Sequence, residues 1–161
     1  MNVDIHPDLQ PLAFLVGIWR GTGAGEYPTI EPFQYVEEVR VHHVGKPFLT
    51  YAQKTRDAQT DLPLHVETGY FRPAGSGRVE LVVAQPSGIV EIQEGSLQDH
   101  TLTLVAVSVA TSSTAKDVSS VSRTITVDGD RMMYRLEMGA VGQPHQHHLT
   151  ATLERVGPPE A

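Results

Sequence analysis

Residues 17–30 read GIWRGTGAGEYPTI, with a glycine at every second position from Gly21 to Gly25. A dinucleotide-binding loop needs the spacing G-x-G-x-x-G and a helix directly after it, because amides at the helix N-terminus bind the pyrophosphate. The spacing here is different, and Pro28, Thr29 and Ile30 do not begin a helix. Glycines that alternate along a strand remove the side chains from one face, so the sheet can bend sharply or a bulky group can approach the backbone. The stretch therefore predicts a curved strand.

Composition narrows the function classes. The chain has 161 residues, which is the usual size of one domain, and we expect a single domain over residues 1–161. It contains no cysteine, which excludes disulfides, thiolate metal sites and covalent haem attachment. Nineteen acidic residues against twelve basic ones leave a net charge of −7, so nucleic acid is not an expected partner. The N-terminus lacks a basic leader and the longest apolar run is short, so we expect a cytosolic protein without a membrane partner.

Hydrophobic periodicity predicts an all-β fold. Pro7 suits the first turn of a short N-terminal helix, and Gly17 suits its end. After that, runs rich in Val, Ile, Thr and Tyr alternate apolar with polar residues between short turns. Ten such runs begin near Gly17, Phe33, Pro47, Leu64, Arg78, Gly88, His100, Val118, Arg131 and His147. We therefore expect a ten-stranded antiparallel up-and-down β-barrel with a helix that plugs one end.

Strand parity predicts which side chains face inward. One face of a strand carries Val79, Leu81, Val83 and Gln85, and one face of another carries Met132, Tyr134, Leu136 and Met138. Both faces are mostly apolar with an adaptable or polar group at one end. A barrel of this size has room for one small ligand, and an apolar cavity with a few polar groups is a common lining. Ordinary core packing explains the same parity equally well.

The stretch GIWRGTGAGEYPTI resembles the signature of the nitrobindin family, and VGKPFLTYAQKTR, PLHVETGYFRP, VVAQPSGIVEI and AVGQPHQHHLTATLER resemble family segments in the same order. The resemblance implies a barrel similar to fatty-acid-binding proteins and lipocalins, with a non-covalent heme b at one mouth. It also implies isomerisation of peroxynitrite to nitrate on ferric haem and reversible binding of nitric oxide. These small molecules are the expected partners, and a homodimer stays open.

The family motif HLxAxL implies that His148 holds the iron and carries the catalysis. Strict alternation would place His148 on the face opposite Leu149, and His147 has the better parity for a cavity. His148 could still face inward through a β-bulge, or from a position before the regular strand starts. A neutral imidazole that binds iron also needs an acceptor for its second ring nitrogen, which the sequence does not identify.

Further cofactor-binding residues come from segments that a closed barrel brings together. Leu64 and His65 are adjacent, so at least one of them should lie at the rim. Lys46 would offset the charge of a haem propionate. The full set that the resemblance implies is Thr29, Lys46, Leu64, His65, Gln85, Met138 and His148.

Two other functions stay open. A haem-free barrel could carry a fatty acid or another small hydrophobic ligand. A zinc protein could use His145, His147 and His148, although alternate strand positions aim at most two ligands well. We find no convincing carboxylate pair, because Glu37 and Glu38 lie on opposite faces of a strand, and no hydrolase-type nucleophile turn.

Overall fold

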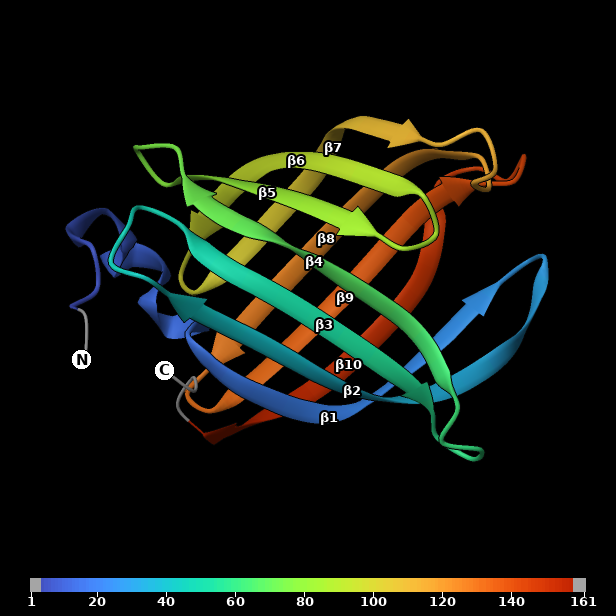
Figure 1. The fold of residues 1–161 in the computed structure, drawn as a ribbon, viewed down its shortest axis with the longest axis horizontal. Helices are drawn as coiled ribbons and strands as arrows, with labels where there is room; N and C mark the ends of the chain where they lie inside the picture. The colour runs from blue at the N-terminus through green and yellow to red at the C-terminus, as the bar shows by residue number, and fades with distance from the viewer. Residues whose placement is uncertain (1–3, 158–161) are drawn as a thin grey trace.

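The computed structural model describes residues 4–157, and these form one closed barrel of ten antiparallel strands, as the sequence predicts (Figure 1). Every strand pairs with its neighbours in the chain, and β1 pairs with β10 to close the ring. No helix in the described range is long and apolar enough to cross a membrane. The elements are η1 (Pro7–Leu15), β1 (Gly17–Tyr27), β2 (Ile30–His43), β3 (Leu49–Asp57), β4 (Pro63–Pro73), β5 (Arg78–Gln85), β6 (Ile89–Gln98), β7 (Thr101–Thr111), β8 (Val118–Asp128), β9 (Arg131–Ala140) and β10 (Gln146–Gly157).

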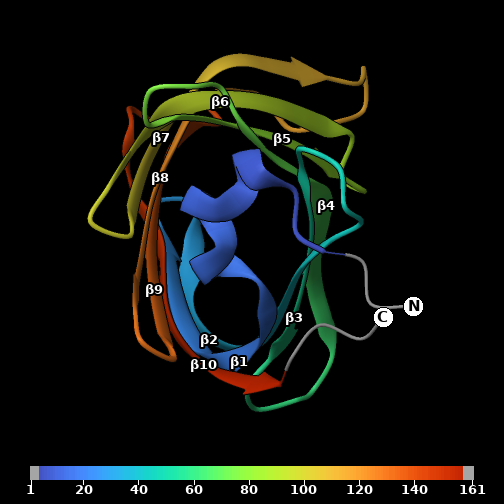
Figure 2. The same ribbon diagram turned by 90° about the vertical axis from the view of Figure 1, so that its left-hand side faces the viewer.

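The short 3-10 helix η1 plugs one end of the barrel, as Figure 2 shows. Leu9, Leu12 and Leu15 on η1 are fully buried. Trp19 at the start of β1 donates a hydrogen bond from Nε1 to the carbonyl of Leu15 at 2.9 Å. The guanidinium of Arg155 on β10 lies 4.1 Å from the centre of the Trp19 ring, a cation–π distance. These contacts connect η1 to β1 through Trp19, and Trp19 to β10 through Arg155.

The alternating glycines of β1 allow large groups to approach its inner face. A Cβ atom at Gly21 would overlap the carbonyl oxygen of Thr152 on β10. At Gly23 and Gly25 it would overlap the aromatic rings of Tyr35 and Phe33 on β2. The glycines therefore let aromatic rings lie flat inside the barrel wall and let β10 come close, which is the close approach that the sequence predicts.

The barrel interior has three layers along its axis. At the plugged end, the side chains of η1 pack with buried residues that include Leu49, Phe71 and Leu153. The middle layer is polar, and the layer near the open end is apolar again. The inward parity predicted for β5 and β9 is confirmed, because Val79, Leu81, Val83, Gln85, Met132, Tyr134, Leu136 and Met138 are buried or half-buried.

We expect Gly21→Ala to lower the free energy of unfolding by about 1–3 kcal/mol, because the added methyl group meets the backbone of β10, which cannot move without opening the seam. Ala24→Ser, at an exposed outward position of the same strand, should change it by less than about 0.5 kcal/mol. Urea denaturation of both variants measures the difference, and equal stabilities would contradict this account of the glycine.

Candidate functional site

A cavity of about 530 Å³ occupies the barrel and opens at the end away from η1. Strand direction explains which loops surround the opening: in a meander of antiparallel strands, every second connection lies at the same end. The mouth is mostly apolar, and its lining includes Ile30, Phe33, Leu64, Ile89, Val118, Val121, Leu136, Met138 and Leu149. Ile30 and Leu64 are 42% and 47% exposed, so the rim presents apolar surface to solvent. An apolar ligand at the mouth would cover that surface.

A β-bulge turns His148 into this cavity. The register between β10 and β9 shifts between His147 and Leu149, and both His148 and Leu149 line the cavity. His147 lies outside it and lines a separate hollow with Ala24 and Asp57. The predicted bulge is therefore present, and it resolves the conflict between strand parity and the motif position in favour of His148.

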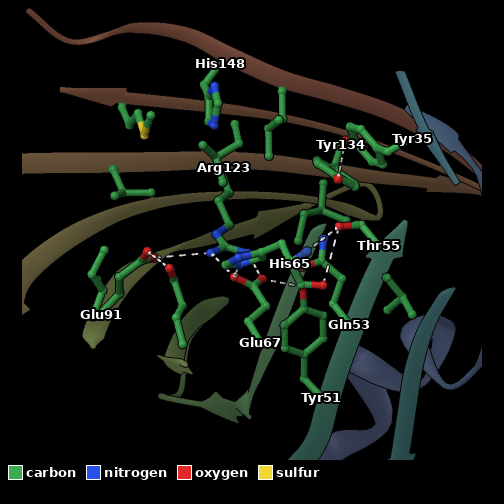
Figure 3. A pocket seen from close by; sticks show the side chains of 18 of the residues that line it. Tyr35, Tyr51, Gln53, Thr55, His65, Glu67, Glu91, Arg123, Tyr134 and His148 are labelled. Atoms are coloured by element: carbon green, nitrogen blue, oxygen red, sulfur yellow. Dashed lines mark hydrogen bonds and ion pairs between the residues drawn. The ribbon is translucent and has the colours of Figure 1, made fainter. Parts of the chain in front are cut away.

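The ring of His148 is held in one tautomer. Its Nδ1 lies 3.1 Å from the carbonyl oxygen of Glu26 on β1. A carbonyl only accepts hydrogen bonds, so Nδ1 carries the proton and Nε2 keeps its lone pair. Burial lowers the pKa of His148, although the hydrogen bond to Glu26 opposes this effect. Figure 3 shows the ring directed into the cavity. The result is a neutral imidazole with its free nitrogen facing an apolar mouth, which is the state a metal ligand needs.

Tyr27, the tyrosine of the YPTI segment, supports this ring. Its aromatic ring makes an edge contact with His148, with centroids 5.4 Å apart. Its hydroxyl accepts a hydrogen bond from the backbone N–H of Ala140 at 2.9 Å and donates to the carbonyl of Met138 at 3.2 Å. Tyr27 therefore connects the end of β1 to the end of β9, next to the first residues of β10, where His148 lies.

The structure brings most of the other predicted residues to the same cavity. Leu64, His65, Gln85 and Met138 all line it. Leu64 lies at the rim, whereas His65 faces inward with its Nε2 3.5 Å from the carboxylate of Glu67. Thr29 lies exposed in the β1–β2 turn at the open end, next to Ile30, and does not itself line the cavity.

The expectation for Lys46 is wrong. Lys46 lies exposed between β2 and β3, at the end of the barrel that η1 plugs, so it is at the far end from His148. Loops alternate between the two ends, and the β2–β3 loop is not on the same side as the β1–β2 turn. Lys116, in the β7–β8 loop, is the lysine that lines the cavity. The sequence alone could have shown this, because counting strands from Thr29 places Lys116 at the same end of the barrel as Thr29 and Lys46 at the opposite end.

The largest difference from the sequence analysis is a belt of polar side chains across the middle of the barrel. It contains three carboxylates where we expected no pair. We call it the polar belt and define it as Glu37, Tyr51, Gln53, Glu67, Glu91, Gln93, Arg123 and Tyr134, which project from six strands. Figure 3 labels six of these residues: Tyr51, Gln53, Glu67, Glu91, Arg123 and Tyr134. The sequence analysis predicted inward-facing residues only for β5 and β9, whose inner faces are mostly apolar. The inward-facing acids and amides of the other strands were therefore not predicted.

Arg123 is the centre of the polar belt. Its guanidinium donates two hydrogen bonds to Glu67, at 2.5 and 3.1 Å, and one to Glu91 at 3.2 Å. Tyr51 donates a further hydrogen bond to Glu67 at 2.7 Å. Burial alone would raise the pKa of Glu67, but the charge of Arg123 and these hydrogen bonds hold it well below its usual range. Glu67 and Arg123 are therefore a buried ion pair at neutral pH.

Glu37 is the acid of the polar belt without a cationic partner in hydrogen-bond contact. Gln53 donates to it at 2.5 Å and Tyr134 at 2.8 Å, and both donors are neutral. Burial raises the pKa of Glu37 to about 7, because the two hydrogen bonds only partly compensate and the charge of Glu67 adds to the effect. Its neighbour Glu38 faces outward and pairs with Arg20, Arg40 and Lys54, as the opposite faces predict.

Comparison with known proteins identifies the family. The sequence pattern of the "THAP4-like, heme-binding beta-barrel domain" matches residues 8–155. The chain belongs to this haem-binding family. Peroxynitrite isomerase 2 of Mycobacterium ulcerans (strain Agy99) is 54% identical over 159 residues, which cover 96% of this chain and 99% of that protein. The relation therefore extends over nearly the full length of both proteins.

Solved structures agree with this membership. The crystal structure of Rv2717c from M. tuberculosis superposes with a TM-score of 0.89 at 49% identity and covers 95% of this chain and 99% of its own. The S-type phycobiliprotein lyase CPES from Guillardia theta has a TM-score of 0.57 at 12% identity, over 92% of this chain and 90% of its own, and is similar in fold alone. The barrel described here is thus shared, over nearly its whole length, with the crystal structure of Rv2717c.

The residues at the mouth fit the cofactor of the haem-binding family. Haem is a flat, mostly apolar macrocycle, and the rim exposes apolar side chains that it would cover. Its iron would be held by an imidazole nitrogen, and His148 offers Nε2 with its other nitrogen already hydrogen-bonded. Lys116 at the rim could pair with a propionate.

A zinc site is not supported. Residues 4–157 contain no group of three or more His, Cys, Asp or Glu side chains placed to hold a metal ion. His145 uses both ring nitrogens in contacts with Ser120 and Ser122, at 2.8 and 2.9 Å. Because His145, His147 and His148 point in different directions, the alternative that used all three is wrong.

We expect Glu37→Gln to stabilise the fold increasingly as the pH rises. In wild type, Glu37 loses its proton near pH 4.5 when unfolded but only near pH 7 when folded, so its contribution to stability falls across this interval. Glutamine does not ionise, so the stability of the variant has no such pH-dependent loss at position 37. The difference in free energy of unfolding between variant and wild type should grow by about 2–3 kcal/mol between pH 5 and pH 8.

Glu38→Gln is the matched control for this prediction. Burial opposes ionisation of Glu38, but hydrogen bonds from Arg40, Arg20 and Lys54 lower its pKa to about 2. Glu38 is therefore ionised in both states above pH 5, and its variant should differ from wild type by a constant amount over the same range. Parallel pH profiles for the two variants in urea denaturation would refute the assignment.

Proposed function

We propose that this chain binds heme b at the barrel mouth through Nε2 of His148 and isomerises peroxynitrite to nitrate on the ferric haem. We also propose that it binds nitric oxide reversibly at the same iron, and that it acts in the cytosol as a single domain. The observation that carries the proposal is the bulged His148, whose Nδ1 is held by the Glu26 carbonyl. The relatives named peroxynitrite isomerase, which match nearly the whole chain, support the reaction.

When bound, a ferric haem would supply a Lewis-acidic, redox-active metal for the rearrangement of peroxynitrite to nitrate. The protein contributes position and access. His148 stays neutral because it is buried, and Glu26 fixes its orientation. Leu64, His65, Gln85 and Met138 surround the space beside it. Lys116 adds a positive charge at the entrance, whereas the carboxylates of the polar belt oppose movement of an anion deeper into the barrel.

The charge of the polar belt also weighs against a fatty-acid carrier. A fatty-acid carboxylate deep inside the barrel, beyond the reach of Lys116 at the rim, would need a free cation. Arg123 is the buried cation in the described part of the barrel, and it already contacts Glu67 and Glu91. A third carboxylate there would meet repulsion from Glu37 as well. The haem-binding function therefore explains the cavity better.

We expect His148→Ala to weaken haem binding at least about tenfold, because loss of an iron ligand removes the strongest contact to the cofactor. His145→Ala should bind haem like wild type, since the His145 ring lies against Ser120 and Ser122 outside the cavity. Titration with ferric haem, followed at the Soret band, measures both. Equal affinities and equal spectra for the two variants would remove the axial role of His148.

The same proteins test the reaction. Haem-loaded wild type should accelerate peroxynitrite decay and raise the yield of nitrate over nitrite, whereas haem-free wild type and haem-exposed His148→Ala should not. If the protein binds haem but does not accelerate peroxynitrite decay, it is a haem carrier, and the isomerase proposal is contradicted.

We further propose a homodimer formed by the exposed edge of β7. The hydrogen-bonded register between β7 and β8 ends at Val105 and Ser122, so residues 106–111 pair with β6 alone. This segment carries no charge, and Val107 at its bulge is 60% exposed. An unpaired, uncharged edge can pair with a second copy of itself in spite of the net negative charge of the chain.

We expect Val107→Lys to shift this protein from dimer to monomer in light scattering, because a lysine on an edge strand blocks strand addition. Val90→Lys, at an exposed position of β6 with partners on both sides, is the control and should leave the mass unchanged. A wild-type monomer at all concentrations would refute the dimer.

A further inference from the structure

The polar belt has an excess of negative charge. Among the side chains that the structure describes inside the barrel, Glu37, Glu67 and Glu91 are each more than nine-tenths buried, and Arg123 is the buried cation. Arg123 contacts Glu67 and Glu91 but not Glu37, whose partners are the neutral groups of Gln53 and Tyr134. A positive group beside Glu37 would favour its ionised form and offset the cost of burying that charge, so the belt favours a cation.

The polar belt also has spare hydrogen-bond acceptors. Gln53 is 6% exposed and lines the cavity, and its Oε1 has no hydrogen-bond partner within residues 4–157. Gln93 is fully buried behind Glu91, and its Oε1 is likewise without a partner in that range. The one spare donor of the belt is Nε of Arg123. Buried polar groups are almost always satisfied, so these oxygens indicate a missing donor.

The unpartnered oxygen of Gln53 and the carboxylate of Glu37 lie together. The amide of Gln53 donates to Glu37, and Gln53 is directly opposite Glu67 in the register between β3 and β4. Figure 3 shows Gln53 and Glu67 on the same side of the cavity, across from His148. A planar cation with several N–H groups can donate to an amide oxygen and a carboxylate at once.

We infer that the polar belt is a second ligand site, which binds a small monovalent organic cation of the alkylguanidinium or alkylammonium class. The charged head donates to Oε1 of Gln53, which lines the cavity, and lies near the carboxylate of Glu37, which Gln53 and Tyr134 separate from the cavity. A short alkyl chain extends towards the apolar mouth. This site is separate in chemistry from the haem site and does not depend on it. The barrel thus has the charge preference opposite to that of a carrier of carboxylate ligands.

The test uses n-butylguanidinium chloride as the probe, because the guanidinium stays charged and does not ligate iron as a free amine would. The full-length chain is titrated by calorimetry and by NMR of the glutamine side-chain amides, with and without saturating haem. Butylurea has nearly the same shape without the charge, and butyrate has the opposite charge. We expect saturable one-to-one binding of butylguanidinium and at least about tenfold weaker binding of the other two, because a charged hydrogen-bonded pair is lost.

Two variants locate the site. Glu37→Gln should weaken butylguanidinium binding about tenfold, whereas Glu38→Gln, on the outer face of the same strand, should leave it unchanged. Gln53→Met removes the spare acceptor at similar volume and should also weaken binding, which covers the case in which one belt variant fails to fold.

Three results would overturn the inference. Butylurea that binds as tightly as butylguanidinium would show a purely apolar site. Equal effects of Glu37→Gln and Glu38→Gln would place the cation on the outer surface. An absence of saturation in both the haem-free and the haem-loaded protein would leave water as the occupant of the polar belt. Since haem binding is measured in the same samples, each of these outcomes is distinct from failure of the haem site.

Discussion

The pairing of β1 with β10 is the constraint on which the rest of the structure depends. It converts a ten-stranded meander into a closed ring, and it aligns Gly25 with Leu149. In that register the carbonyl of Glu26 reaches Nδ1 of the bulged His148. The close approach of the two strands requires a residue without a side chain at Gly21. The glycine ladder therefore shapes the functional site from a distance, although none of its atoms needs to touch a ligand.

Closure also forces every inward side chain to share one space, and the chain divides that space into regions of different chemistry. The mouth is apolar and carries one oriented imidazole, which suits a flat macrocycle with a metal at its centre. Below it, Glu37, Glu67, Glu91 and Arg123 place titratable groups in a low-dielectric wall, where each charge strongly affects the next. Barrels of similar shape can thus select opposite charges, because selection depends on which inward positions are acidic or basic and not on the fold.

Much of the fold was predictable from local pattern. The ten strands, their antiparallel order and the N-terminal helix all follow from period-two alternation and short turns, and the observed strands begin within a few residues of the predicted positions. The irregularity at His148 was predictable as well, because motif and parity agree only if the strand is bulged there or has not yet begun, and the structure shows the bulge. Lys46 was placed wrongly because the motif was read without following the strands, although the alternation of loops between the two ends separates it from Thr29.

The sequence by itself determined the strand count, the curved first strand and the histidine at the mouth, because these depend on periodicity and on one local motif. Only the tertiary structure decided that Arg123 contacts Glu67 and Glu91 while Glu37 has only neutral partners, since these residues lie on separate strands and their distances depend on register and closure. The tertiary structure also supplied the acceptor for His148, a backbone carbonyl that any residue at position 26 could offer. The sequence specifies which chemical groups are present. Their partners depend on which strands lie opposite each other across the barrel, and only closure and register determine that.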